Sequence, residues 1–270
     1  MRNILLTRQS HFQIFCANSL YFENIITDVI VEKGASISMI TKRNVLQKIV
    51  KNVNYSLLFN PIISLRKFQN FINHKKYYGN RDFHNKRLFK KDYETFNSGI
   101  ELHNVENVND KDTIAIIKNL NPDLIYVFGT RMISSKIIGM MKCPIVNMHW
   151  GLSPKYRGEG IVTALAKSGM SDVGVTIHLL DRTSDGGDII FQGGTKIDVN
   201  DNFYSIGLKL TKIGITAFKD VFQSFLKNKG IMGKKQDLTK GKLYGSIFMK
   251  KHPEILSIAW KKLCEEKLCL

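Results

Sequence analysis

Residues 143–158 read CPIVNMHWGLSPKYRG, an apolar run followed at once by an amide, an imidazole and a turn. The apolar run, 143–147, is typical of a buried strand. It brings Asn147 and His149 to the carboxyl end of that strand, which is where open α/β sheets bind their ligands. The two side chains therefore either complete a strand and its loop or face a reacting group.

Strand and helix patterns alternate on both sides of this stretch. Buried or β-branched runs predict strands at 3–7, 25–31, 100–105, 123–128, 173–180, 188–192 and 195–197. Helical spacing and capping residues predict helices at 11–21, 110–120, 134–141, 160–168, 205–228 and 255–267. The alternation predicts the α/β class, with an open, mostly parallel, Rossmann-like sheet and helices on both faces.

Two regions depart from this alternation. Residues 41–96 are basic and aromatic, and we expect a largely helical insertion there, with helices at 45–58 and 62–72. Its aromatic residues favour a small hydrophobic cluster over a platform for stacked bases. Residues 229–270 are basic and, apart from the last helix, irregular, so we expect a short C-terminal extension.

The composition fits one large domain, or one domain with a small appendage, in 270 residues. No apolar stretch approaches the roughly 20 residues that span a bilayer. The sequence becomes polar after residue 6, which is unlike the longer apolar segment of a signal peptide. We therefore expect a cytoplasmic protein without membrane contact. The net charge of +17 implies attraction to anions, but it is spread along the chain, as on a solvated basic surface.

Cysteine spacing gives no sign of a metal centre. Cys16 and Cys143 stand among apolar neighbours and are expected to be small buried hydrophobic residues. Cys264 and Cys269 have no companion His or Cys at zinc-binding spacing. We therefore expect no metal ligand among them.

Asn147, His149 and Asp185 are the candidate catalytic residues. Taken one at a time, each has an ordinary explanation: an Asn that caps a turn, a His in a core or loop, and an Asp before two glycines in a turn. Their neighbours change this interpretation. The stretch NMHWGLSPKYRG (147–158) precedes GVTIHLLDRTSDGGDII (174–190), and both follow PDLIYVFGTRMIS (122–134). These three ordered blocks resemble the folate-dependent formyltransferase family, from residue 122 to about residue 228.

The resemblance implies a reaction and a role for each matched residue. The family transfers a formyl group from N10-formyltetrahydrofolate, a co-substrate, to an amine. His149 would accept or shuttle a proton as the amine attacks, since an imidazole titrates near working pH. Asn147 would donate its amide N–H to the oxyanion. Asp185 would support His149 and a proton-carrying water, and residues 1–228 would form the catalytic domain.

The resemblance also implies two binding segments. The donor would contact the strand end at Arg131, Met132 and Ile133, and the loop that contains Leu180, Asp181 and Ser184. The acceptor would contact the turn that contains Lys155, Tyr156, Arg157 and Gly158, with Lys155 and Arg157 as phosphate contacts. His178 matches a recurrent histidine of the family, for which we favour a structural role over a catalytic one.

Departures from the family pattern narrow the choice of acceptor substrate. The segment TRQSHFQIF (7–15) lacks the glycines of the loop with which glycinamide ribonucleotide formyltransferases hold phosphate. The tail after residue 229 is shorter than the second domain of methionyl-tRNA formyltransferases, and Trp150 stands where the family usually has proline or a small residue. At Trp150 we expect only the local turn to differ. The missing glycines and the short tail favour a small phosphorylated amine, an amino sugar on a nucleotide carrier.

Three alternatives stay open at this level. A methionyl-tRNA formyltransferase-like enzyme would also suit the positive charge, and so would a basic nucleic-acid-binding protein without catalysis, which we favour less. Other small amines are also acceptable substrates in chemical terms. The family often dimerises, so the resemblance leaves a homodimer open as well.

Overall fold

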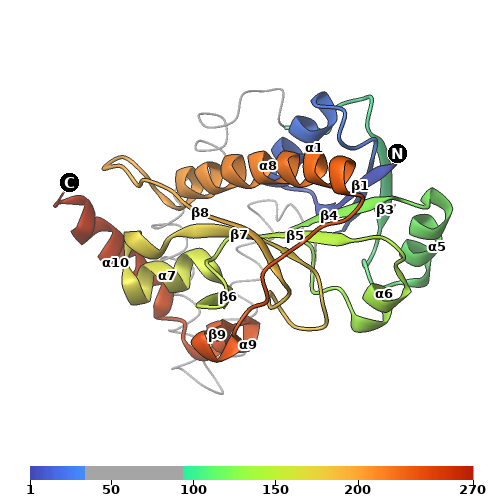
Figure 1. Ribbon diagram of the computed structural model, residues 1–270. Helices are drawn as coiled ribbons and strands as arrows, with labels where there is room; N and C mark the ends of the chain where they lie inside the picture. Colours follow the sequence, from blue (N-terminus) through green and yellow to red (C-terminus); the bar gives the residue numbers. More distant parts are fainter. Residues whose placement is uncertain (34–93, 270) are drawn as a thin grey trace, which may run out of the picture.

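A computed structural model of the chain describes residues 1–33 and 94–269. They form a seven-stranded sheet in the order β3-β2-β1-β4-β5-β7-β8 (Figure 1). Its strands are β1 (Asn3–Arg8), β2 (Asp28–Glu32), β3 (Glu101–Val105), β4 (Leu124–Phe128), β5 (Ile145–His149), β7 (Gly174–Leu179) and β8 (Ile189–Gly194). The helices are α1 (His11–Phe22), α5 (Lys111–Leu120), α6 (Ser135–Met140), α7 (Gly160–Ser168), α8 (Phe203–Asn228), α9 (Ser246–Lys251) and α10 (Ile255–Lys267).

The sheet confirms the predicted α/β class and its mostly parallel character. Strands β3, β2, β1, β4 and β5 run parallel to their neighbours. Strand β7 then pairs antiparallel with β5, and β8 pairs antiparallel with β7. Helices α1, α5 and α6 lie in the connections β1–β2, β3–β4 and β4–β5, as is usual between parallel strands, whereas β7 and β8 are joined by the polar loop 180–188 alone.

Helices cover both faces of the sheet, and each face has its own apolar cluster. On one face α1 and α8 pack over a cluster that includes Leu20, Tyr126 and Phe218 and that continues into α7 and α10 (Figure 1). On the other face α5 and α6 cover a smaller cluster that includes Ile117 and Ile137. The middle strands are buried on both sides, which explains their continuous apolar sequences.

Local sequence explains where the long helix α8 begins. The side chain of Asn202 accepts hydrogen bonds from the backbone N–H groups of Tyr204 and Ser205, at 2.9 and 3.0 Å. In return the Ser205 Oγ accepts from the N–H of Asn202, which completes a capping box. The helix therefore begins at Phe203, two residues before the predicted start.

Two sequence predictions need correction, and a third is not tested. The second strand spans Asp28–Glu32 rather than 25–31, because Ile25 and Ile26 are buried in the preceding turn. Residues 195–197 are not a strand, and β8 already ends at Gly194. The predicted insertion, 41–96, lies outside the described residues except for its last three.

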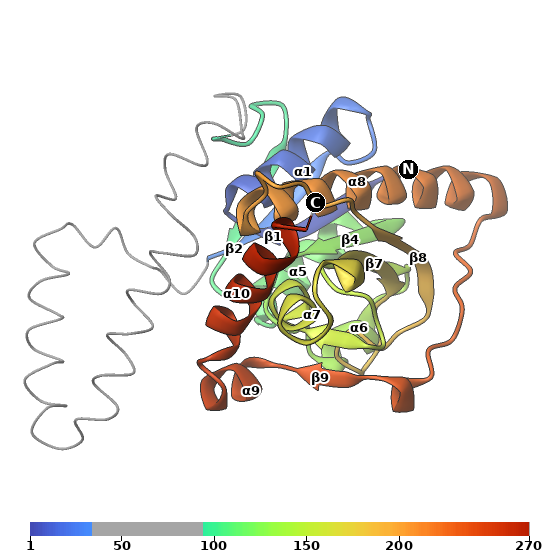
Figure 2. The ribbon, with the colours of Figure 1, turned by 90° about the vertical axis from the view of Figure 1, so that its left-hand side faces the viewer.

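The C-terminal extension is more ordered than predicted. A short strand, β9 (Lys242–Tyr244), pairs parallel with β6 (Tyr156–Gly158) and forms a second, two-stranded sheet. Helix α10 packs along α7 (Figure 2). The extension thus runs beside the turn that follows His149. Among the described helices, none combines the length and the apolar composition that a membrane span requires.

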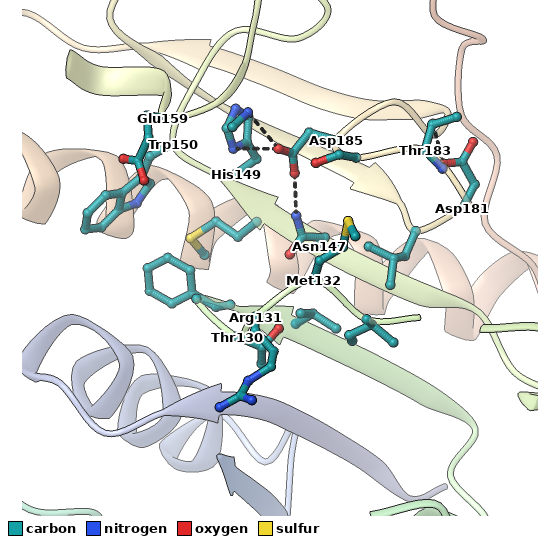
Figure 3. Close-up of a pocket in the computed structure, with 18 of the residues that line it drawn as sticks. Thr130, Arg131, Met132, Asn147, His149, Trp150, Glu159, Asp181, Thr183 and Asp185 are labelled. Atoms are coloured by element: carbon teal, nitrogen blue, oxygen red, sulfur yellow. Dashed lines mark hydrogen bonds and ion pairs between the residues drawn. The ribbon is translucent and has the colours of Figure 1, made fainter. Parts of the chain in front are cut away.

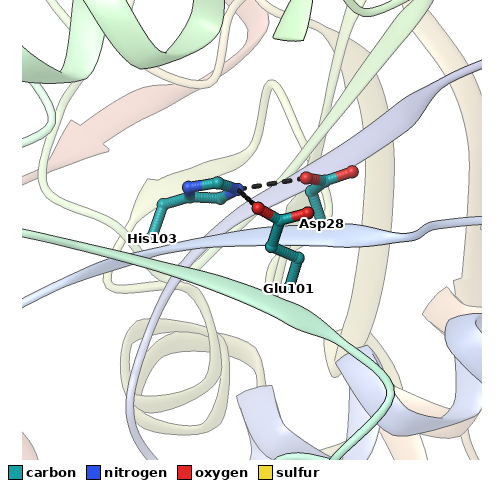
Figure 4. A group of neighbouring side chains, drawn as sticks. All are labelled: Asp28, Glu101 and His103. Atoms are coloured by element: carbon teal, nitrogen blue, oxygen red, sulfur yellow. Dashed lines mark hydrogen bonds and ion pairs between the residues drawn. The ribbon is translucent and has the colours of Figure 1, made fainter.

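A cluster of Asp28, Glu101 and His103 lies at the amino-terminal edge of the sheet, opposite the strand ends that carry the candidate site (Figure 4). His103 Nε2 lies 3.0 Å from Asp28 Oδ1, and the Thr27 hydroxyl donates to Asp28 Oδ2 at 2.6 Å. The Arg2 guanidinium lies 3.5 Å from the same oxygen. Both oxygens of the buried Asp28 carboxylate are therefore satisfied by side chains that join the edge strands.

Candidate active site

The structure brings Asn147, His149 and Asp185 together. Asn147 and His149 lie two residues apart on β5, so their side chains leave the same face of that strand. Asp185 comes from the loop between β7 and β8, which turns back toward β5. Figure 3 shows the three side chains pointing toward one another across the end of the sheet.

Asp185 bridges the other two side chains. Its Oδ2 lies 3.6 Å from His149 Nδ1, and its Oδ1 accepts from Asn147 Nδ2 at 3.5 Å. The backbone N–H of Gly158 donates to Asp185 Oδ2 at 2.9 Å, so the carboxylate also contacts the turn after β5. The carboxylate therefore contacts a proton-accepting group and an amide donor at once.

A backbone carbonyl sets the tautomer of His149. The imidazole is buried, and its Nε2 lies 2.7 Å from the carbonyl oxygen of Tyr156. A carbonyl oxygen only accepts, so Nε2 carries the hydrogen. Nδ1, which faces Asp185, is then the ring nitrogen that is left to take up a proton.

His178 sets the orientation of the Asn147 amide in the same way. His178 is fully buried, and its Nδ1 donates to the carbonyl of Leu179 at 2.8 Å. In the neutral ring Nε2 is then an acceptor, and it lies 3.0 Å from Asn147 Nδ2. One hydrogen of the Asn147 amide is therefore used by His178, and the other points toward Asp185.

The surroundings of Asp185 favour its charged form. Burial alone would raise the pKa of this carboxyl. At the acid pH where Asp185 titrates, the positive charge of a protonated His149, the hydrogen bond and charge of a protonated His178, and the N–H of Gly158 outweigh burial and hold the pKa of Asp185 well below its usual range. The carboxylate is therefore ionised across the whole range of working pH.

The loop that carries Asp185 has an unusual backbone. Asp185 has a φ of +49°, in the left-handed region that Asp tolerates better than most residues. Gly187 follows where the chain passes so close to β7 that a Cβ would lie 1.9 Å from the carbonyl oxygen of Leu179. Earlier in the loop the Asp181 carboxylate accepts from the N–H and hydroxyl of Thr183, which forms an Asx turn.

A cavity of about 430 Å³ opens beside these residues. Small-molecule sites typically measure about 300–1,000 Å³. The three candidate catalytic residues line it, together with residues 127–133 at the end of β4 and residues 180–184 of the loop. Gln13, Trp150 and Glu159 also line it, and sequence reasoning did not propose them as site residues.

Trp150 and Glu159 lie side by side on the wall past His149 (Figure 3). The Trp150 ring packs edge-on against Phe12, with ring centres 4.9 Å apart, and against Phe128. Glu159 is exposed to solvent at the mouth of the cavity. Desolvation by the neighbouring protein atoms raises the pKa of Glu159, although a protonated His149 acts in the opposite direction. Their positions directly after His149 and Gly158 are the sequence signal that could have identified them.

The sequence profile described as "Formyl transferase" matches residues 65–221, more than half of the chain. The chain belongs to the formyl transferase family. A methionyl-tRNA formyltransferase of Caldicellulosiruptor saccharolyticus is 29% identical over 126 residues, which are 46% of this chain and 40% of that protein. The chain spans less than half the length of the curated relatives it matches.

Solved structures of formyltransferases share the fold. A sugar N-formyltransferase from a Shewanella species superposes with a TM-score of 0.57 at 15% identity, over 97% of this chain and 87% of that one. A phosphoribosylglycinamide formyltransferase from Anaplasma phagocytophilum gives a TM-score of 0.54 at 16% identity, over 87% and 93% of the two chains. Enzymes with different acceptors thus resemble this chain about equally.

The segment predicted to contact the donor lies at the cavity, but its side chains differ in direction. The guanidinium of Arg131 pairs with the buried Glu32, away from the candidate catalytic residues (Figure 3). Ile133 is buried in the core, whereas Met132 exposes 74% of its surface. Asn109 holds this strand end by donating to the carbonyl of Met132. The backbone N–H of Arg131 donates to the same Glu32 carboxylate at 3.0 Å, so both groups contact Glu32 rather than the candidate catalytic residues.

The loop residues predicted to contact the donor also lie at the cavity. Leu180, Asp181 and Ser184 all line it. Leu180 is anchored by its N–H, which donates to the carbonyl of Ile145 at 2.8 Å. The carbonyl of Ser184 accepts from the Arg157 guanidinium at 3.5 Å. The loop is thus connected both to β5 and to the turn that follows β5.

The four residues predicted to contact the acceptor occupy different environments in the structure. Only Gly158 lines the cavity. The Lys155 ammonium is exposed and pairs with Asp172 at 2.5 Å. Tyr156 is buried, and its hydroxyl donates to the same carboxylate at 2.9 Å. The pair with Asp172 raises the pKa of Lys155 and lowers that of Asp172. The side chains of Lys155 and Tyr156 therefore stabilise the turn, and Arg157 faces the loop.

Proposed function

We propose that this protein transfers a formyl group from N10-formyltetrahydrofolate to a primary amine. The observation that carries the proposal is the convergence of Asn147, His149 and Asp185 at one end of the cavity, with Asp185 within 3.6 Å of both partners. A proton acceptor, an amide donor and a carboxylate are the groups that acyl transfer to an amine needs. Membership of the formyl transferase family supports the same reaction.

The proposed reaction forms one C–N bond and breaks another. The acceptor nitrogen attacks the formyl carbon, the bond from that carbon to N10 breaks, and N10 gains a proton. His149 Nδ1 takes the proton that the attacking amine loses, because Nε2 already donates to the carbonyl of Tyr156. Asp185 stabilises the resulting imidazolium through its negative charge. The proton is then delivered to N10, directly or through a water.

Asn147 supplies the donor for the charge that develops on the formyl oxygen. One of its Nδ2 hydrogens is held by His178 at 3.0 Å, which fixes the plane of the amide. The other hydrogen points toward Asp185 over a weak 3.5 Å contact, so an incoming oxygen can take it. A donor fixed before the reaction can contribute roughly 3 kcal/mol to the transition state.

The wall formed by residues 127–133 and 180–185 fits the flat, partly polar ring of a folate. Its side chains mix the apolar Val127, Ile133 and Leu180 with backbone groups of the loop. Met132 exposes 74% of its surface at this wall, an apolar area that a bound ring would cover. When bound there, N10-formyltetrahydrofolate supplies the formyl group, and the chain provides orientation and proton transfer.

We propose an amino sugar on a nucleotide carrier as the acceptor. The loop after β1 lacks glycine, which disfavours the backbone phosphate cradle of a glycinamide ribonucleotide enzyme. The Glu159 carboxyl at the cavity mouth suits an acceptor that arrives as an ammonium. The charge of +17 suits its phosphates. Methionyl-tRNA is the second candidate, because curated relatives at 27–29% identity bear that name.

An acceptor panel tests this proposal. The purified protein is incubated with N10-formyltetrahydrofolate and, separately, with amino-sugar nucleotides, glycinamide ribonucleotide and methionyl-tRNA. We expect tetrahydrofolate release with an amino-sugar nucleotide, and mass spectrometry should show that acceptor heavier by one formyl group. Formylation of methionyl-tRNA alone would overturn the sugar assignment. Absence of transfer to every acceptor, together with absence of folate binding, would overturn the enzymatic function.

A further inference from the structure

The C-terminal extension places one side chain against the backbone of the loop that carries Asp185. Gln236 is 8% exposed and lies outside the span that matches the family profile, residues 65–221. Its Nε2 donates to the carbonyl oxygen of Asp185 at 3.1 Å and to that of Gly187 at 2.5 Å. The extension thus contacts the loop directly at its candidate catalytic residue and two residues later.

The geometry fixes the orientation of the Gln236 amide. Both hydrogens of Nε2 are used by the two carbonyls, and within the described part of the chain no donor reaches the buried Oε1. Rotating the amide by 180° would place Oε1 against two carbonyl oxygens, which repel it. A buried acceptor without a partner costs free energy. The two hydrogen bonds that the amide donates therefore account for the burial and the orientation of the Gln236 side chain.

The extension also contacts two segments that adjoin this loop, the first residue of β8 and strand β6. Two residues before Gln236, Lys234 forms an isolated β-bridge with Ile189, through backbone hydrogen bonds of 2.7 and 2.8 Å. Past it toward the C-terminus, β9 pairs with β6, and Tyr244 lies opposite Gly158. Gly158 is the residue whose N–H donates to the Asp185 carboxylate. Asp185 is thus contacted from its backbone side and, through β6, from its carboxylate side.

The contacts from the extension reach the part of the loop that its Asx turn at Asp181 and Thr183 does not include. Asp185 has a left-handed backbone, and the two glycines after it allow many other conformations. The Asp185 carboxylate must nevertheless stay within reach of both Asn147 and His149. We propose that Gln236 is a positioning residue that holds Asp185 in its place beside His149, a role that rests on the proposed function.

A matched pair of variants tests the role in catalysis. Gln236→Met keeps the length of the side chain and removes both donors, and Gln223→Met makes the same change on an exposed face of α8. With the acceptor found in the panel, we expect Gln236→Met to lower kcat at least tenfold and to leave KM for the folate donor within threefold, while Gln223→Met behaves as wild type. Gln236→Glu should lower kcat more than Gln236→Met does, because a carboxylate repels the two carbonyl oxygens.

A spectroscopic measurement tests the role without any acceptor. The side-chain ¹³C signal of Asp185, assigned by its loss in Asp185→Asn, is followed in a pH titration of each protein. In Gln236→Met we expect the titration to move upward toward the range of an ordinary Asp, since the carboxylate loses its fixed contacts. A folded Gln236→Met protein with wild-type kcat, or with an unshifted Asp185 titration, would overturn the inference. A wild-type protein without transfer would instead overturn the proposed function, and the titration would still decide the role of Gln236.

Discussion

His149 Nδ1 and Asp185 Oδ2 lie 3.6 Å apart, and each is held from its other side by the backbone of a single short turn. Tyr156 accepts from His149 Nε2, and Gly158 donates to Asp185 Oδ2. The turn after β5 therefore sets both the tautomer of the imidazole and the position of the carboxylate. This arrangement leaves one ring nitrogen of His149 able to accept a proton next to an ionised carboxylate, which is the basis of the first prediction below and of the closing test.

Replacement of Asp185 should change how the free energy of unfolding depends on pH in the acid range. Because the folded pKa of Asp185 lies below its unfolded value of about 3.9, its ionised form stabilises the protein at pH values above about 4. That contribution is lost as pH falls from about 4 through the folded pKa. We expect the difference in unfolding free energy between wild type and Asp185→Asn to shrink over this range in urea titrations.

The comparison needs a neutral substitution in the same loop. Ser184→Ala removes no titrating group, so its difference from wild type should stay constant between pH 7 and pH 3. A difference between wild type and Asp185→Asn that also stays constant over that range would contradict the assignment of a lowered pKa to Asp185.

Removal of the Asn147 amide should slow the chemical step. We expect Asn147→Ala to lower kcat about 100- to 1,000-fold with a small change in donor binding, as for other oxyanion donors. Asn119→Ala, on the exposed side of α5, is the matched control. The measurement is single-turnover transfer together with donor titration by the fluorescence of Trp150 and Trp260. A normal rate for Asn147→Ala would exclude this amide from the reaction.

Lys155→Ala separates the sequence prediction from the structure. The resemblance to the family predicts an acceptor contact, whereas the structure pairs Lys155 with Asp172 away from the cavity. Exposed ion pairs contribute about 0–1 kcal/mol, so we expect at most that loss of stability and roughly wild-type kcat/KM. The measurement is steady-state kinetics with the acceptor varied. A tenfold rise in KM for the acceptor would favour the sequence prediction.

Gly187→Ala should destabilise the loop. A Cβ at Gly187 would lie 1.9 Å from the carbonyl oxygen of Leu179, so the chain must move. We expect a loss of about 1–3 kcal/mol, as for other forced insertions of a methyl group. Gly139→Ala is the control, because a Cβ on this α6 residue meets no atom within 4 Å. That control should keep or raise stability, since Ala favours a helix by up to about 1 kcal/mol. Equal melting temperatures for both variants would contradict the model of a tightly packed loop.

The sequence allowed the main layers of the fold to be predicted because their signals are local. Apolar runs predicted β4 and β5, and α6 lies within the predicted range 134–141, where the side chain of Ser134 caps it by accepting from the N–H of Ile137. Asn147 and His149 were placed correctly at a strand end for the same reason. Their meeting with Asp185 could be expected only from the resemblance to a family, because the loop that carries Asp185 belongs to a separate β-hairpin.

The parts that could not be predicted depend on contacts between distant segments. Strand β9 has only three residues, KLY, and no alternating pattern, so its pairing with β6 has no sequence signature. Gln236 stands in a basic stretch that looks solvated, yet it is buried against the loop. The contact of His178 with Asn147 likewise depends on the register of β7 against β5, in which these two residues are directly opposite.

The most direct test of the central claim is single-turnover release of tetrahydrofolate from N10-formyltetrahydrofolate by wild type and His149→Ala. The acceptor is the one that the panel identifies, and circular dichroism confirms that both proteins are folded. If His149 Nδ1 takes the proton from the attacking amine, the variant should bind the donor normally and react about 100- to 10,000-fold more slowly. A folded His149→Ala protein that transfers the formyl group at the wild-type rate would contradict the account.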